Sequence, residues 1–350
     1  MSKKTYYYVT GNTASGFINV LPTNVKDFNH VVILNHPSYT LKTAVISELI
    51  KEYEFEYDLE VLKSSIAGEF LDGVIIREKS LAVVVDTIAT PDVKGAIELD
   101  LSLFAQEDFI LTDERMKMKN KYEEQVKAAY DNFHIGLKIH DGLEEIFISQ
   151  MNFDHANQLA EKLITILLGS VAVKDRPTQT FHRLFGTNTA DGIVNVVPHL
   201  TEFIYNVYHI KGRAGTGKST FMKKIVEACE NHGLDVELYY CSFDPNSIDM
   251  VLVRELDFCI FDSTDPHEFF PQRKGEVIID LYEEAVTPGT DEKFAEEIHK
   301  LNTAYKSFMK RGISDLKIAG EHLRNMEKVY NVVEKDVKQV TGFITTNIAE

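Results

Sequence analysis

The chain has 350 residues, of which 44% are hydrophobic, so it is long enough to bury two substantial cores. Its 37 basic and 54 acidic residues give a formal net charge of −17 with no basic cluster, which argues against a nucleic-acid-binding surface. We find no signal peptide and no apolar run long enough to span a bilayer, and therefore expect a cytoplasmic protein without membrane contact. The three cysteines lack metal-ligand spacing and are expected to be buried, reduced thiols.

An internal duplication becomes visible when the chain is laid over itself with a shift of 176 residues. Residues 12–22 then fall on residues 188–198, with identical Asn, Thr, Ala, Gly, Asn, Val and Pro. The same shift aligns Lys42 with Lys218, Thr43 with Ser219, and Asp86 with Asp262. A shift of 177 aligns Asp72 with Asp249. We predict two repeats, residues 1–173 and 174–350, with the boundary where residues 172–177 leave the helical pattern.

Both repeats show the same predicted order of elements. A β-rich segment (5–9; 180–185) precedes an Asn-Thr-Ala-x-Gly turn, a buried strand (31–34; 207–210) and a helix (219–230 in the second repeat). A second strand (57–62; 236–240), a polar turn and a third strand follow, and the repeat ends in charged helical sequence (113–168; 291–349). This alternation predicts an α/β fold with a parallel sheet in each repeat. We interpret each appendage as a helical hairpin, bent near Gly136 and residues 311–312, that serves as a lid or as a packing surface.

The second repeat carries a complete phosphate-binding motif between its predicted strand and helix. The motif reads Gly212-Arg213-Ala214-Gly215-Thr216-Gly217-Lys218-Ser219 and is followed by Thr220. Glycines let backbone N–H groups approach phosphate oxygens closely, and the helix adds its positive N-terminal dipole. We expect Lys218 to reach the β- and γ-phosphates and Ser219 to ligate Mg²⁺. The fold prediction is therefore two tandem P-loop NTPase-type domains, each with its hairpin appendage.

Asp262 ends the apolar strand 258–261 and is the predicted magnesium partner of the motif. A carboxylate at the carboxyl end of such a strand lies beside the phosphate loop, where it holds Mg²⁺ directly or through water. The alternative is a turn aspartate that closes the strand.

The first repeat keeps the lysine and hydroxyl residue at the end of the motif but lacks the glycines of the loop. His36, Pro37, Tyr39 and Leu41 stand where Gly212, Arg213, Gly215 and Gly217 stand in the second repeat. Because proline removes a donor and side chains obstruct the backbone, we expect weak nucleotide binding or none. Lys42 and Thr43 either serve a relic site or belong to a structural helix, with the lysine in a salt bridge.

Other polar residues follow the predicted strands of the second repeat. Ser242, Asp244 and Asp249 could orient a water or an acceptor hydroxyl, or form an Asx-type turn. Asp265 and His267 are candidates for acid–base or γ-phosphate-sensing roles, and a turn with a surface histidine explains them as well. Arg213 and Arg254 could contact phosphate, although the recurrence of Arg254-Glu255 as Arg77-Glu78 favours a structural ion pair.

Together, the intact motif with residues 220–224, the segment 240–245 and the segment 262–267 resemble a little-characterised bacterial family of duplicated P-loop proteins. Its members are described as ATPases or as nucleotide-kinase-like. The resemblance covers nearly the whole chain and implies ATP binding through residues 212–220, with magnesium held by Ser219 and Asp262. It implies no particular substrate. In that family the first loop is typically glycine-rich too, unlike here.

Two functions remain open at this point. In the first, Mg-ATP undergoes slow hydrolysis or passes its γ-phosphoryl group to a small-molecule acceptor, with Lys218, Asp262 and Asp265 as catalytic residues. In the second, ATP binding alone sets the packing of the two halves, so that the protein is a nucleotide-dependent switch or scaffold. No glutamate follows Asp262 directly, which argues against a fast motor-type ATPase. The sequence predicts no oligomeric state.

Overall fold

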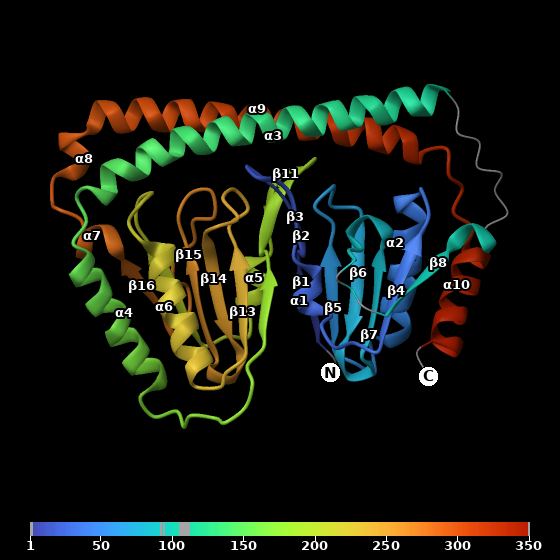
Figure 1. Cartoon of the computed structure of the whole chain (residues 1–350), viewed down its shortest axis with the longest axis horizontal. Helices are drawn as coiled ribbons and strands as arrows, with labels where there is room; N and C mark the ends of the chain where they lie inside the picture. Colours follow the sequence, from blue (N-terminus) through green and yellow to red (C-terminus); the bar gives the residue numbers. More distant parts are fainter. Residues whose placement is uncertain (1–2, 92, 94, 105–112, 349–350) are drawn as a thin grey trace.

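The computed structural model describes residues 3–91, 93, 95–104 and 113–348, and shows two α/β lobes side by side beneath two long helices (Figure 1). The first sheet contains β1 (Lys4–Tyr7), β4 (His30–Asn35), β5 (Leu59–Lys63), β6 (Leu71–Ile76), β7 (Leu81–Val85) and β8 (Ala96–Asp100). The second contains β9 (Thr180–Arg183), β12 (Asn206–Lys211), β13 (Val236–Tyr240), β14 (Ile248–Val253), β15 (Phe258–Asp262) and β16 (Glu276–Asp280). Their orders, β1-β5-β6-β7-β4-β8 and β9-β13-β14-β15-β12-β16, are equivalent, as the duplication predicts.

Parallel pairs predominate in both sheets, as the predicted parallel sheet requires, but each sheet is mixed. In the second sheet β12 is parallel to β15 and β16, and β13 is parallel to β9. The additional strand β14 is antiparallel to both of its neighbours. Short connections before and after β14 leave no room for a crossover helix, so the chain must reverse direction twice. The polar turn predicted here covers only the first of these connections.

Helices α2 (Tyr39–Tyr53) and α6 (Lys218–Asn231) follow strands β4 and β12, as predicted for the second repeat. Two small hairpins, β2 (Thr10–Thr13) with β3 (Gly16–Asn19) and β10 (Gly186–Thr189) with β11 (Gly192–Asn195), lie between the lobes. The remaining short elements are α1 (Leu21–Asn24), α5 (Val197–Thr201), α7 (Leu281–Ala285), α8 (Thr290–Lys293) and the 3₁₀ turns Arg77–Lys79, Asp86–Ile88, Leu101–Leu103 and Arg254–Leu256.

The two repeats exchange their terminal helices. Helix α3 (Asp113–Ile148) leaves the first lobe, runs across both lobes and leads to α4 (Phe153–Leu168), which packs on α6 of the second lobe (Figure 1). Helix α9 (Ala295–Glu327) returns antiparallel to α3 and leads to α10 (Glu334–Asn347), which packs on α2 of the first lobe. Leu163 of α4 shares a buried cluster with Phe221 of α6. Each lobe is therefore completed by a helix from the other repeat.

This exchange shows why the predicted hairpin bends were wrong. Gly136 and Gly312 lie inside the continuous helices α3 and α9, and the long helices pair with each other. A Cβ on Gly312 would lie 2.4 Å from the Phe133 ring. The glycine thus permits close helix packing instead of a turn. Of the segment expected to be helical, Ala349 lies outside the described residues.

Polar contacts join the two lobes, and some of them are made by equivalent residues of the two repeats. The side-chain amides of Asn12 and Asn188 donate reciprocally to the other residue's carbonyl oxygen, at 2.8 and 2.9 Å. The buried guanidinium of Arg183 contacts Glu60 at 2.9 Å and Glu237 at 2.8 Å. Burial alone would raise the pKa of Glu237, but Arg183 and Arg254 hold it at about 2. The asparagine of the Asn-Thr-Ala-x-Gly turn, which both repeats contain, therefore contributes to the contact between the lobes.

Within residues 113–348 and the other described segments, no helix combines the length and apolar character needed to cross a membrane. Cys229, Cys241 and Cys259 are free, as predicted, with Cys229 and Cys259 buried and Cys241 half-buried. Burial raises the pKa of the Cys229 thiol to about 12, so this thiol remains protonated and inert.

Candidate functional site

A glycine loop, residues 212–217, connects β12 to α6. Gly215 and Gly217 have φ angles of +72° and +78°, a left-handed conformation that favours glycine. Gly217 is the N-cap of α6 and offers no side-chain cap. Among the described residues, the N–H groups of Gly215 and Gly217 donate to no protein acceptor. The loop therefore presents unpaired donors at the positive end of a helix.

Lys218 and Asp262 converge at this loop. The Lys218 ammonium donates to the Arg213 carbonyl oxygen at 2.8 Å and lies 3.5 Å from an Asp262 carboxylate oxygen. The other Asp262 oxygen accepts hydrogen bonds from the backbone and hydroxyl of Thr264. Parallel pairing of β12 with β15 places the carboxyl end of β15 beside the loop, as the sequence predicted.

Asp249 is a half-buried carboxyl group beside Asp262. It lies on β14, whose next residue, Met250, is paired with Phe261 directly before Asp262. Burial and then the Asp262 charge raise the pKa of Asp249 to about 7. The sequence placed Asp249 in a loop, whereas the structure puts it on the inserted antiparallel strand and at the site.

Ser219 holds the start of that strand. Its hydroxyl oxygen accepts a hydrogen bond from the Ile248 N–H at 3.0 Å, and Thr43 accepts one from the Leu71 N–H at 3.1 Å in the first repeat. The described residues contain no cluster of three His, Cys, Asp or Glu side chains suited to a metal. Mg²⁺ commonly uses only one or two protein carboxylates plus phosphate and water, so Ser219 and Asp262 fit such an ion without a protein cage.

The carboxyl-terminal part of α3 covers the glycine loop. The Glu144 carbonyl oxygen would lie 2.5 Å from a Cβ on Gly215, so only glycine fits beneath it. His140, one helical turn earlier, has a buried Nδ1 that finds no hydrogen-bond partner among the described residues and lies 3.6 Å from a Glu144 carboxylate oxygen. Burial, and then the Lys218 charge, lowers the pKa of His140. Burial, and then Asp141, raises that of Glu144.

Sequence reasoning missed His140 and Glu144. Their signal is a His-x-x-x-Glu spacing that places both side chains on one helix face. The shift of 179 that aligns Leu137 with Leu316 gives Ala319 and Leu323 at the equivalent positions of α9. The two groups are therefore specific to the helix above the intact loop.

The other predicted site residues lie around this centre with varied partners. Arg213 pairs with Asp291 at 2.8 Å, and Asp265 is exposed and pairs with Lys306 of α9 at 2.7 Å. His267 is buried against Phe185, so the surface-histidine alternative was wrong. Ala214 and Thr216 lie in the loop, and Thr220 is exposed on α6. Asp244 accepts a hydrogen bond from the Asn246 N–H in an Asx-type turn, and the Ser242 carbonyl oxygen accepts one from the Asn188 side chain. Arg254 pairs with Glu237, as expected of a structural ion pair.

In the first repeat, a carboxylate of the same chain binds the backbone N–H groups of the equivalent loop. Helix α2 begins at Tyr39, with Ser38 as its N-cap. The Glu327 carboxylate, from the end of α9, accepts hydrogen bonds from the N–H groups of Tyr39 and Thr40 at 3.1 and 2.9 Å. It also accepts from the Ser38 and Thr40 hydroxyls at 2.9 and 2.7 Å.

Lys42, the counterpart of Lys218, is buried and contacts Asp86 at 2.5 Å. The prediction of a salt-bridged lysine on a structural helix is confirmed. The first repeat thus retains the lysine–aspartate pair while a carboxylate fills the helix N-terminus next to it.

No family model, curated protein or solved structure matches this chain. The degenerate copy inside the chain therefore provides the comparison for the intact loop.

Proposed function

We propose that the second repeat is a P-loop site that binds Mg-ATP. The observation that carries this proposal is the pair of helix N-termini. Where the motif is degenerate, the loop N–H groups bind the Glu327 carboxylate, and where it is intact, the Gly215 and Gly217 N–H groups have no acceptor among the described residues. The first loop thus binds an oxyanion that the chain itself supplies, and in our proposal phosphate oxygens are the equivalent acceptors at the second loop.

In this proposal each group has a defined role. The glycine-loop N–H groups and Lys218 bind the β- and γ-phosphates, and Ser219 and Asp262 hold Mg²⁺. When bound, the ion neutralises charge on the phosphoryl group. Asp249 accepts a proton from the attacking hydroxyl or water, because its pKa of about 7 suits a general base. The exposed, ion-paired Asp265 is less suited to that role than Asp249.

The reaction we favour is slow ATP hydrolysis or phosphoryl transfer to a small acceptor, of the nucleotide-kinase type. We place the acceptor near His140 and Glu144, whose side chains lie on the helix α3 that covers the loop. The His140 Nδ1 atom is buried and has no hydrogen-bond partner among the described residues, which supports positioning of an acceptor hydroxyl and favours transfer over hydrolysis.

A second candidate, the nucleotide-dependent switch, is favoured by the contact of α3 with the loop. The Glu144 backbone lies directly on Gly215, and α3 packs along α9 over both lobes. Phosphates arriving at the loop would displace or reorient this part of α3. That movement would reach the first lobe through α9 and its Glu327 carboxylate.

Nucleotide binding is tested by calorimetric titration of Mg-ATP. Lys218→Ala should weaken binding by about 1.5–3 kcal/mol, because it removes a charge-assisted contact to phosphate. Lys223→Ala, on the exposed side of the same helix, is the matched control and should leave affinity unchanged. Lys42→Ala should also leave it unchanged, with one nucleotide per chain. Equal affinity of Lys218→Ala and the native protein would refute the site.

Asp262→Asn separates the two candidate functions. For an enzyme, phosphoryl transfer should fall at least tenfold, about 1.4 kcal/mol, with ATP still bound through Lys218 and the loop. For a switch, turnover is negligible and the variant should lose the ATP-induced change in hydrogen exchange across α9. If Asp262→Asn changed neither the rate of phosphoryl transfer nor the hydrogen exchange of α9, a magnesium role for Asp262 would be refuted.

A further inference from the structure

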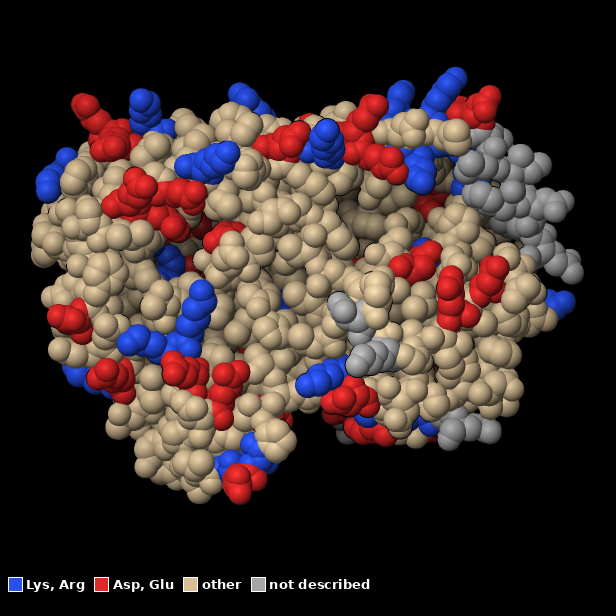
Figure 2. Space-filling model, in the orientation of Figure 1, with Lys and Arg blue, Asp and Glu red and all other residues tan. Residues whose placement is uncertain are grey.

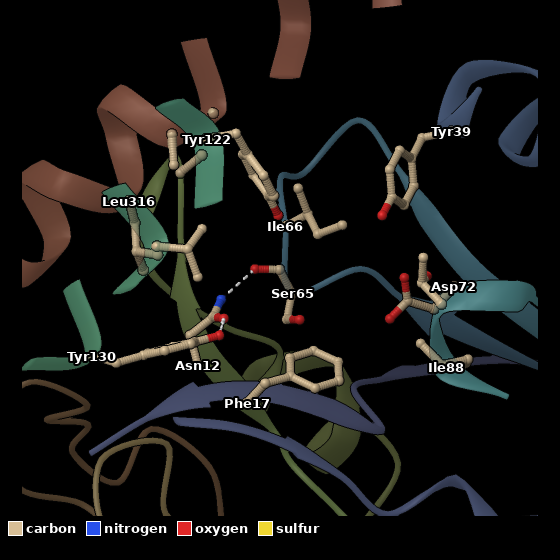
Figure 3. Close-up of a pocket in the computed structure, with 15 residues that line it drawn as sticks. Asn12, Phe17, Tyr39, Ser65, Ile66, Asp72, Ile88, Tyr122, Tyr130 and Leu316 are labelled. Atoms are coloured by element: carbon tan, nitrogen blue, oxygen red, sulfur yellow. Dashed lines mark hydrogen bonds between the residues drawn. The ribbon is translucent and has the colours of Figure 1, made fainter. Parts of the chain in front are cut away.

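The first lobe contains a cavity of about 120 Å³ beneath the long helices. A cavity of about 150 Å³ holds a benzene-sized molecule, so this one suits a ligand of five or six heavy atoms. The rings of Phe17, Tyr39, Tyr122 and Tyr130 line it, together with the Asp72 carboxylate. In Figure 3 the carboxylate points into the space bordered by Tyr39, Ser65 and Phe17. Phe17 is 47% exposed, so the cavity borders solvent, and Figure 2 shows the surface hollowed beneath the long helices in this region.

The cavity results from divergence between the repeats. Val126 of α3 lines it, and the shift of 179 places Tyr305 at the equivalent position of α9. The Tyr305 ring packs against Phe243 and His140 at centroid distances of 5.5 and 5.1 Å. A tyrosine therefore fills the second lobe where valine leaves space in the first.

Asp72 has no counter-charge among the residues that the structure describes. Its side chain is 2% exposed and accepts a hydrogen bond from the Thr10 hydroxyl at 2.8 Å. In the part of the chain that the structure describes, no lysine or arginine lies within ion-pair distance of it. The nearby Lys42 is bound to Asp86 and lies 4.4 Å from the centroid of the Tyr39 ring. Burial raises the pKa of Asp72 to about 6, so the group is still largely ionised at neutral pH.

We propose that this cavity binds a small organic cation, a primary alkylammonium whose charge pairs with Asp72 and whose carbon skeleton lies among the aromatic rings. Burying an ionised carboxylate without a counter-charge is costly, and an ammonium group lowers that cost. Aromatic faces attract the same cation through their negative quadrupole. An anion is disfavoured by Asp72, and a neutral ligand of the same shape leaves the carboxylate unpaired. The proposal does not rest on nucleotide binding by the second repeat.

The test is calorimetric titration of the full chain at pH 7.5 with isobutylammonium chloride and, separately, with isobutanol at matched chloride. The two probes have the same shape and differ in charge. The ammonium should bind at least tenfold more tightly than the alcohol. Equal affinity for both probes, or no saturable binding of the ammonium, would overturn the proposal.

Two variants locate the binding in the cavity. Asp72→Asn should lower the ammonium affinity to that of the alcohol, and Val126→Tyr should abolish binding of both by filling the space as Tyr305 does. Asp58→Asn removes an equal charge from an exposed position of the same lobe and should change neither affinity. If Asp72→Asn does not fold, Val126→Tyr alone decides, because unchanged ammonium affinity in that variant places the binding elsewhere and refutes the site.

Discussion

At the N-terminus of α2, Tyr39 and Thr40 donate their N–H groups to Glu327, whereas at the N-terminus of α6 those of Gly215 and Gly217 meet no acceptor among the described residues. The helices that cover the two loops differ accordingly. The shift of 179 places Ile148 of α3 at the position of Glu327 in α9. One loop is thus a structural joint held by a carboxylate of the other repeat, whereas the second loop leaves backbone N–H groups unpaired among the described residues.

The largest expected effect comes from separating the repeats. Residues 1–173 and 174–350, produced as two chains, should each lack cooperative unfolding and should regain it when mixed. Helix α10 buries Val337, Val340 and Ile344 in the first lobe, and losing three such side chains costs roughly 5–9 kcal/mol. That is comparable to the stability of a whole domain. Cooperative melting of either fragment alone, at the temperature of the full chain, would contradict the exchange of helices.

Removal of the Glu327 carboxylate should destabilise the first lobe next most strongly. Glu327→Ala leaves two N–H groups and two hydroxyls without their acceptor, and should lower the free energy of unfolding by about 2–4 kcal/mol. Glu327→Gln keeps one carbonyl oxygen and should lose less. Chemical denaturation measures both, and equal stability of Glu327→Ala and the native protein would show that the joint is dispensable.

The helix crossing gives a third test, because Phe133 and Gly312 occupy equivalent positions in the two repeats and contact each other. Gly312→Ala should destabilise the protein by about 1–3 kcal/mol, since its Cβ overlaps the Phe133 ring. Gly342→Ala is the control on α10, where a Cβ meets nothing within 4 Å. It should stabilise by about 0.5–1 kcal/mol through helix propensity. Thermal unfolding that moves in the same direction for both variants would contradict the close crossing.

The smallest effect compares the equivalent carboxyl groups Asp249 and Asp72 by pH. Each has a folded pKa, about 7 and about 6, above its ordinary value, so the folded state binds the proton more tightly and stability falls as pH rises toward that pKa. Between pH 6 and 8 the native protein should lose roughly 1 kcal/mol relative to Asp249→Asn, and less relative to Asp72→Asn. Denaturation at several pH values measures both differences. A larger loss of stability relative to Asp72→Asn than relative to Asp249→Asn would show that Asp72, not Asp249, has the higher folded pKa.

The sequence predicted the elements nearest the glycine loop well because local sterics determine them. Gly215 and Gly217 impose left-handed turns that prevent the helix from starting before Lys218, whereas Ser38 and Tyr39 allow α2 to begin three positions earlier. The apolar run before Asp262 likewise predicted β15 and its position beside the loop. The antiparallel strand β14 was not predicted, because its apolar segment is short and follows directly on polar residues that indicated a turn.

Tertiary structure alone decided which partners these local elements meet. Nothing in the sequence around residue 38 points to Glu327, which lies almost 300 positions later and arrives only because α9 crosses both lobes. The same crossing brings His140 and Glu144 over the glycine loop and places α4 and α10 on the opposite lobes. Backbone turns follow from the steric preferences of adjacent residues, so they can be predicted from sequence. The pairing of long helices depends on how completely each alternative buries their apolar faces, which only the assembled fold determines.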